Sequence, residues 1–301
     1  MADKKCTWCE NRSMWLGVGA TAGLLTGIKW WRAQQAKRTS PLLRHGEHLT
    51  ALVTGASSGI GAAYSAELAR RGYDVILVAR RREKLAALAE QLSHTYGVEA
   101  TPVTADLSTE ADIERIEHVL AATETLNLLV NNAGFGLVEP FSKARVERHL
   151  DMVRLHIHAV VRLTRAALPI MLTQRRGAVI NVSSLMAYYP LGDNSTYAGT
   201  KCYLRAFTEA LHQELNGTGV RVQSLCPGFV KTEMPTPRRV CSVDLPDLLW
   251  MAPQTVVDQS LRDLARDRVI SVPGLGYRIL ASIAGLVPRR LFYLIGSRVR
   301  R

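Results

Sequence analysis

The chain has 301 residues, of which 47% are hydrophobic and 21% are charged, so intrinsic disorder over its whole length is excluded. Its formal net charge is +12 at pH 7, which raises the question of a nucleic-acid partner. The excess lies at the two ends: residues 1–45 are strongly basic, and residues 268–301 contain seven arginines and no acidic residue. Because the stretch between them is nearly neutral, we expect no nucleic-acid-binding face on the core.

Residues 1–45 contain an apolar run, Ser13–Ile28, that holds no charged residue. As a helix it would extend about 24 Å, somewhat less than the roughly 30 Å of a bilayer core. Tryptophans flank the run, and Lys29 can reach the headgroups. More positive charge follows the run than precedes it, so we expect a membrane anchor with the globular part of the chain on the cytosolic side. A soluble tail, and with it a cytoplasmic protein, is the alternative.

Residues 274–301 form a second terminal segment. Apolar residues recur at a spacing of three to four through Tyr277–Val287, and the only charged residues of the segment are arginines. A basic amphipathic helix of this kind suits an anionic membrane surface. The alternative is a helix that packs on the core or on a partner subunit.

Residues 46–273 alternate short apolar runs with helical patterns. Continuous runs of Val, Ile and Leu indicate strands that are buried on both faces of a parallel sheet. Alternation of strands and helices gives right-handed crossovers. We therefore predict one α/β domain with a doubly wound parallel sheet of the Rossmann type. The predicted strands are Leu49–Val53, Val75–Ala79, Ala100–Thr104, Leu126–Val130, Ala178–Val182, Val220–Cys226 and Val269–Pro273. The predicted helices include Gly59–Arg71, Arg82–Tyr96, Thr109–Ala122, Ala144–Gln174 and Thr196–Leu215.

A glycine-rich turn, Thr54–Gly61, joins the first predicted strand to the first helix. Its backbone N–H groups and the positive end of the helix dipole favour a pyrophosphate. The residues expected to contact the cofactor are Gly55, Ser57, Ser58, Gly59, Ile60 and Gly61.

The second predicted strand ends at Ala79, where NAD-binding proteins place an acidic residue for the adenosine ribose. Three arginines, Arg80–Arg82, follow instead. Guanidinium groups bind phosphate, so Arg80 is predicted to bind the 2′-phosphate of NADP. Cations at a helix N-terminus oppose the dipole, so a solvated helix start explains these arginines poorly.

Four further motifs follow along the chain. They are Asn131-Asn132-Ala133-Gly134, Asn181–Ser184, Tyr197-x-x-x-Lys201 and Cys226–Thr232. Together with the glycine-rich turn, and in this order, they resemble the short-chain dehydrogenase/reductase superfamily over residues 48–273. The resemblance implies an NADPH cofactor and a homodimer or tetramer built through the two long helices. It also implies contacts from Asp106 to the adenine, Asn132 to the adenosine side, Tyr197 and Lys201 to the nicotinamide ribose side, and Val230 and Thr232 to the nicotinamide amide.

The chemistry of the third motif supports the same interpretation independently. Tyr197 and Lys201 are four residues apart and lie on one face of a helix. A neighbouring ammonium favours a phenolate, so we expect a lowered pKa for Tyr197, which can then act as acid or base near neutral pH. Ser184 ends a buried strand at the carboxyl edge of the sheet, where ligands bind. Its hydroxyl is predicted to hold the substrate oxygen.

One position departs from the family pattern. The family has a fourth catalytic residue, an asparagine, eight positions before the threonine of Thr164-Arg-Ala-Ala-Leu-Pro169, and this chain has His156 there. The asparagine helps to place a water chain beneath the lysine, and His156 is predicted either to do the same or to impair the relay. His158 is two residues away and points elsewhere, so no metal site is predicted.

The sequence therefore predicts an NADPH-dependent oxidoreductase that interconverts a carbonyl and an alcohol on an apolar, lipid-like or steroid-like substrate. The pocket is expected to be lined by Phe135, Met186 and Tyr188 and closed by the segment from Thr232 to about Met251. The alternative is a cofactor-binding scaffold or redox sensor without turnover, which the histidine at position 156 would permit. The scattered cysteines fit a reducing compartment.

Overall fold

The computed structural model of the chain describes residues 48–190, 192–233, 239–240, 243–244 and 246–284. These residues all belong to one unit that runs from Pro41 to Arg301. The predicted apolar segment Ser13–Ile28 and the end of the chain beyond Ala284 lie outside the described residues.

Within the described residues, seven parallel strands form the central sheet in the order β3-β2-β1-β4-β5-β6-β9. They are β1 (Leu49–Thr54), β2 (Tyr73–Ala79), β3 (Ala100–Thr104), β4 (Leu126–Asn131), β5 (Gly177–Val182), β6 (Val220–Leu225) and β9 (Ile270–Ser271). Every residue of the four central strands is buried, and most are apolar, although buried polar side chains such as Asn127, Arg221 and Gln223 interrupt the runs. The strand order reverses between β1 and β4, and this point marks the crevice where ligands bind in such sheets.

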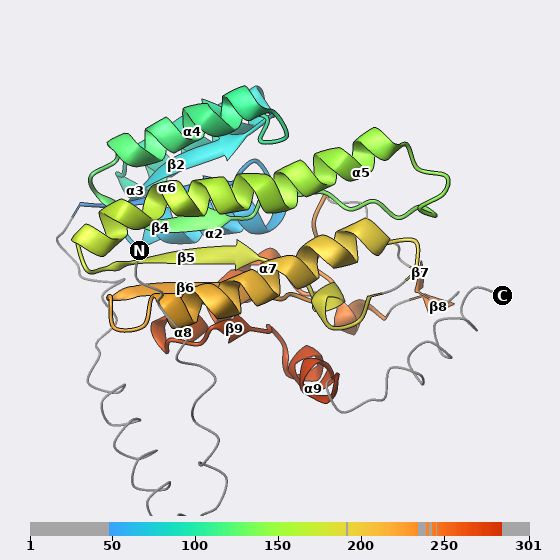
Figure 1. Ribbon diagram of the computed structural model, residues 1–301. Helices are drawn as coiled ribbons and strands as arrows, with labels where there is room; N and C mark the ends of the chain where they lie inside the picture. The colour runs from blue at the N-terminus through green and yellow to red at the C-terminus, as the bar shows by residue number, and fades with distance from the viewer. Residues whose placement is uncertain (1–47, 191, 234–238, 241–242, 245, 285–301) are drawn as a thin grey trace, which may run out of the picture. The chain divides into compact units, whose positions relative to one another are not determined.

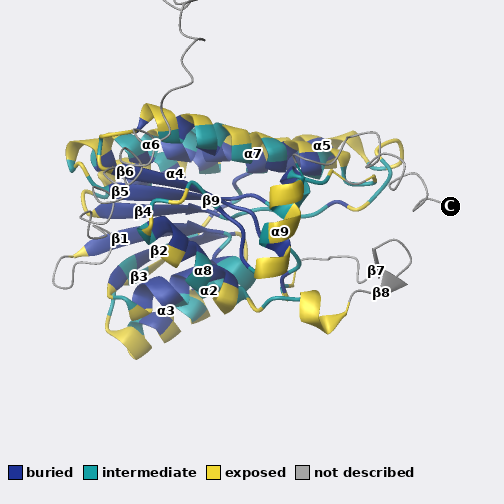
Figure 2. Cartoon of the chain, turned by 90° about the horizontal axis from the view of Figure 1, so that it is seen from below, coloured by how far each residue is buried: buried dark blue, intermediate teal, exposed yellow. Residues whose placement is uncertain are grey.

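Helices cover both faces of the sheet (Figures 1 and 2). One face carries α2 (Gly59–Arg70), α3 (Arg82–Tyr96) and α8 (Pro253–Ala265). The other carries α4 (Glu110–Ala122), α6 (Ala159–Thr173) and α7 (Ser195–Glu214). Each set forms its own apolar cluster with the side chains of the adjacent sheet face. The predicted doubly wound parallel fold is confirmed.

The long helix predicted over Ala144–Gln174 contains a change of pitch. It begins as α5 (Val146–Val153), widens into a π-helical turn at Arg154–His158, and continues as α6. Such turns are frequent at functional sites, and this one carries His156. Within the described residues, Val146–Thr173 is the one helix long and apolar enough by composition to span a membrane. Its apolar residues pack on the sheet, which explains that composition.

The chain after β6 differs most from the prediction. The strand predicted over Val269–Pro273 is only the two residues of β9, because it pairs with β6 alone at the edge of the sheet. The final described helix, α9 (Leu275–Ile283), begins two residues before the predicted start at Tyr277 and lies beside the carboxyl ends of the strands (Figure 2). The remaining short elements are the strands β7 (Arg239–Val240) and β8 (Val243–Asp244) and the 3-10 turns Leu185–Ala187 and Asp247–Leu249.

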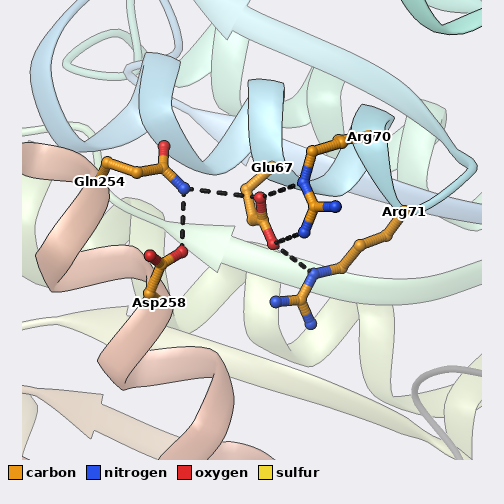
Figure 3. Close-up of polar contacts among 5 residues, drawn as sticks. All are labelled: Glu67, Arg70, Arg71, Gln254 and Asp258. Carbon is orange, nitrogen blue, oxygen red and sulfur yellow. Dashed lines mark hydrogen bonds and ion pairs between the residues drawn. The ribbon is translucent and has the colours of Figure 1, made fainter.

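A buried carboxylate joins α2 to α8 (Figure 3). Glu67 accepts hydrogen bonds from Arg70 at 2.7 and 2.8 Å and from Arg71 at 2.7 Å. The amide of Gln254 on α8 lies 3.5 Å from the same carboxylate and donates to Asp258 at 2.9 Å. These arginines hold the pKa of Glu67 below its usual value. Because α2 begins at the glycine-rich turn, this cluster also helps to fix the position of that turn.

Candidate active site

The glycine-rich turn packs against the end of β4 through Asn132. The Asn132 amide donates to the carbonyls of Thr54 at 2.9 Å and Gly55 at 3.3 Å. A Cβ at Gly55 would lie 2.8 Å from that amide, and a Cβ at Gly61 would lie 2.3 Å from the Gly55 carbonyl oxygen. Side chains at these two positions would force the turn apart, so the glycines and Asn132 together set its shape. Ser58 caps the start of α2 as an extended residue.

The arginine that reaches the glycine-rich turn is Arg81. Its guanidinium donates to the hydroxyl of Ser57 at 3.0 and 3.1 Å and to the hydroxyl of Ser58 at 2.6 Å. Arg80, the residue singled out from the sequence, extends away with 68% of its side chain exposed and lies 3.8 Å from Asp106. Three consecutive arginines follow the strand, and the sequence alone does not indicate which of them contacts the glycine-rich turn.

An acidic residue from a distant part of the chain completes this basic cluster. Glu233, which directly follows Thr232, accepts from Arg81 at 2.5 Å and from Lys84 at 2.8 Å. Hydrogen bonds from Lys84 and Arg81 lower the pKa of Glu233 to about 2. A carboxylate is thus held beside Arg81, the neighbour of the Arg80 that was predicted to bind the 2′-phosphate.

The predicted catalytic residues come together at the carboxyl edge of the sheet. Ser184 follows β5, where its hydroxyl accepts from the Met186 N–H at 3.1 Å and shares a hydrogen bond with Tyr197. Tyr197 and Lys201 both lie on α7. The Lys201 ammonium is buried, donates to the Val182 carbonyl at 2.8 Å and lies 5.5 Å from the centre of the Tyr197 ring.

The protonation of this group differs from the expectation. Burial raises the pKa of Tyr197, and the hydrogen bond from Ser184 offsets that only in part. Burial also lowers the pKa of Lys201 to about 8. The predicted net lowering of the tyrosine pKa is therefore wrong for this structure, because burial raises this pKa by more than the hydrogen bond lowers it. At neutral pH Tyr197 is a protonated phenol, the form that can donate a proton to a carbonyl oxygen.

His156 is buried, and both of its ring nitrogens make hydrogen bonds. Its Nε2 accepts from the Phe135 N–H at 3.1 Å, so Nδ1 carries the hydrogen and donates to the Thr200 hydroxyl at 3.0 Å. Burial and the charge of Lys201 hold the pKa of His156 well below its usual value, so the imidazole is neutral. A Cβ at Gly134 would lie 2.8 Å from Nε2, so the glycine of the Asn-Asn-Ala-Gly motif makes room for the ring.

The remaining residues predicted to contact the cofactor follow the carboxyl ends of β3 and β6. Asp106 accepts from the N–H of Ser108 at 3.0 Å and from its hydroxyl at 2.7 Å. Val230 forms an isolated parallel β-bridge with Met251. A Cβ at Gly59 would lie 3.0 Å from the methyl group of Thr232, which places Thr232 beside the glycine-rich turn. Among the described residues, no group of three or more His, Cys, Asp or Glu side chains could hold a metal ion.

Fold and site together define a dinucleotide-dependent oxidoreductase of the short-chain type. Residues 49–240 match the short chain dehydrogenase family, and the chain belongs to it. The very-long-chain 3-oxoacyl-CoA reductase of Anas platyrhynchos is 34% identical over 227 residues, which cover 74% of this chain and 72% of that protein. The predicted family and the predicted oxidoreductase class are confirmed.

Two solved structures share this fold at similar levels of identity. A short-chain dehydrogenase from Sphingobium yanoikuyae in complex with NADPH is 31% identical, with a TM-score of 0.70 over 79% of this chain and 93% of that one. The bulky-bulky ketone specific alcohol dehydrogenase from Comamonas testosteroni is 29% identical, with a TM-score of 0.69 over the same shares of the two chains.

Proposed function

We propose that this chain uses NADPH to reduce a ketone that carries large apolar groups on both sides. The observation that supports ketone reduction best is the Ser184–Tyr197–Lys201 group, in which the lysine is buried and the phenol is protonated at neutral pH. NADP is the cofactor of this oxidoreductase. The glycine-rich turn and Arg81 would hold its pyrophosphate and 2′-phosphate, because guanidinium groups bind phosphate oxygens in pairs.

The residues of the chain divide the reaction among them. Bound NADPH supplies the hydride for the carbonyl carbon. Ser184 donates a hydrogen bond to the carbonyl oxygen, and Tyr197 gives that oxygen its proton. The charge of Lys201 stabilises the phenolate that remains. A scaffold without turnover, the alternative left open by His156, would have no use for this arrangement.

The walls near Ser184 favour an apolar substrate. Tyr188 and Phe229 belong to an apolar cluster, and the Phe229 ring lies 5.4 Å from the ring of Trp250. A 3-oxoacyl-CoA has an acyl chain on one side of its ketone and a thioester on the other. It therefore shares with a bulky-bulky ketone the same demand for room on both sides, and the relatives above are named for these two substrate classes.

A direct assay tests this proposal. Purified full-length protein is mixed with NADPH and 3-oxohexadecanoyl-CoA, with 3-oxobutanoyl-CoA and a polar sugar ketone such as sorbose as controls. We expect NADPH oxidation with the long-chain ketone and a much lower kcat/KM for the two controls. A lack of oxidation with every ketone, or a preference for the sugar, would contradict the proposal.

We also propose that the protein works at a membrane surface. Leu275, Ile279 and Ile283 of α9 are 72%, 55% and 39% exposed, and the chain beyond α9 adds arginines without acidic residues. The full chain should pellet with membranes, and deletion of residues 1–45 should leave a weaker attachment that high salt releases. Full-length protein that stays soluble at low salt would contradict this, and α9 would then be better placed against a partner subunit.

The homodimer or tetramer expected from the family resemblance stays a prediction. Exposed apolar side chains on the long helices support it: Val146 and Leu150 on α5 are 57% and 48% exposed, and Tyr203 on α7 is 39% exposed. Sedimentation analysis of detergent-solubilised protein would measure the state directly.

A further inference from the structure

Tyr277 is the buried residue of α9, a helix that lies outside the region matched by the family. It is 8% exposed, although Leu275 and Ile279 beside it are 72% and 55% exposed. Its hydroxyl makes two hydrogen bonds. It accepts from the Phe229 N–H at 3.3 Å and donates to the Leu249 carbonyl at 2.6 Å.

These two partners lie at opposite ends of the segment expected to close the substrate pocket. Two backbone hydrogen bonds join the chain on either side of this segment. The Met251 N–H donates to the Phe229 carbonyl and the Lys231 N–H donates to the Met251 carbonyl, both at 2.9 Å. We call residues 229–231 and 249–251 the loop stem. The Tyr277 hydroxyl therefore bridges the two sides of the loop stem.

The ring of Tyr277 is also closely packed. A Cβ at Gly228 would lie 2.3 Å from the ring, so the ring packs directly on the Gly228 main chain. On its other side α9 is tied to the segment after Ser184, because the Tyr189 hydroxyl donates to the Leu280 carbonyl at 2.5 Å. α9 thus bonds both to the segment that follows Ser184 and to the loop stem.

We propose that Tyr277 is a positioning residue that fixes the spacing of the loop stem, from which the segment expected to close the substrate pocket departs and to which it returns. This inference rests on the proposed reductase function. Val230 lies in the loop stem and Thr232 follows it directly, and both are expected to contact the nicotinamide. A loosened stem would weaken the binding of large ketones more than it would slow the proton and hydride transfers.

Hydrogen exchange measures the loop stem directly. Tyr277→Phe keeps the ring and its packing on Gly228 but removes both hydrogen bonds. In full-length protein, we expect the amides of 229–231 and 249–251 to exchange about fivefold faster or more, with no change in β5. Tyr73→Phe is the matched control, because it removes a buried hydroxyl bonded to Asn127 at 3.3 Å, far from the loop stem in the chain.

Kinetics provide the second measurement. With NADPH and 3-oxohexadecanoyl-CoA, we expect Tyr277→Phe to raise KM about tenfold and to change kcat less than about threefold. Unchanged exchange in the loop stem overturns the proposal. Faster exchange across the whole sheet, or loss of all protection, also overturns it, because either outcome shows a general structural role. Exchange needs no substrate, so a failure of the proposed reductase function would be seen separately from a failure of this inference.

Discussion

The Nδ1 of His156 donates to the hydroxyl of Thr200 over 3.0 Å, and that hydroxyl donates in turn to the carbonyl of Tyr197 at 2.8 Å. The histidine at the position of the family's catalytic asparagine is therefore connected to the catalytic tyrosine through one side chain. Because Nε2 accepts from the Phe135 N–H, the ring also ties α7 to the segment after β4. We therefore propose that His156 is a positioning residue that acts as a neutral imidazole.

The first prediction concerns this neutral state. Burial keeps the pKa of His156 below its usual value, so the ring should stay unprotonated as pH falls through 6.5, the ordinary value. Nitrogen chemical shifts of labelled histidine should show one neutral imidazole in the Nδ1–H form throughout this range. His156→Leu should lower kcat about tenfold or more, because Phe135 N–H and the Thr200 hydroxyl lose a buried partner. A histidine that protonates near its ordinary pKa would contradict this role.

The second prediction concerns cofactor choice. Arg81→Ala should weaken NADPH binding about 10- to 100-fold, because it removes a charge-assisted pair of bonds to the 2′-phosphate, and should leave NADH binding nearly unchanged. Arg80→Ala is the matched control and should change NADPH binding less than about threefold, since its guanidinium faces Asp106 and solvent. Fluorescence titration with both cofactors measures this. The reverse order of the two variants would restore the original assignment to Arg80.

The third prediction concerns pH. The pKa of Lys201 is lowered to about 8, so its ammonium is present below that pH and is lost above it. Since the charge stabilises the phenolate left on Tyr197, kcat/KM for ketone reduction should be level at neutral pH and fall as pH rises through about 8. A Lys201→Arg variant, however slow, should lack this decline because a guanidinium keeps its charge. A wild-type profile that is level to pH 10 would contradict the assignment.

The fourth prediction concerns stability. The arginines beside Glu67 lower its pKa, so the ionised carboxylate stabilises the fold above the ordinary pKa of glutamate, and this contribution is lost as pH falls through the lowered value. Glu67→Gln should reduce the free energy of unfolding by about 1–3 kcal/mol at neutral pH. Glu147→Gln is the control, because that side chain is 61% exposed beside Arg145. Equal melting temperatures for the two variants would show that the cluster in Figure 3 adds no more to stability than an exposed ion pair.

The sequence was sufficient for those parts of the fold that follow from periodicity and from local motifs. Buried parallel strands such as β4 and β5 are mostly apolar, and the glycine-rich turn, Ser184, Tyr197 and Lys201 are recognisable from their order. These features depend on neighbouring residues, so a single chain reveals them.

Features that depend on tertiary contacts were not predictable in this way. The π-helical turn at Arg154–His158 contains no proline or glycine, so no residue of the turn marks it in the sequence. The hydrogen bond from Arg81 to Ser58 depends on the direction that the arginine side chain takes in the fold. The raised pKa of Tyr197 depends on burial. Tyr277 lies 48 residues after Phe229, and nothing in either neighbourhood indicates that they meet.

The measurement that tests the account most directly compares wild-type protein with Tyr197→Phe in NADPH-dependent reduction of 3-oxohexadecanoyl-CoA. The variant keeps the ring and its packing but has no proton to give, so NADPH binding and melting temperature should be unchanged while kcat falls about 10²- to 10⁴-fold. Wild-type activity with a Tyr197→Phe variant that retains most of its rate would show that another group protonates the ketone, and the central assignment of this site would be wrong.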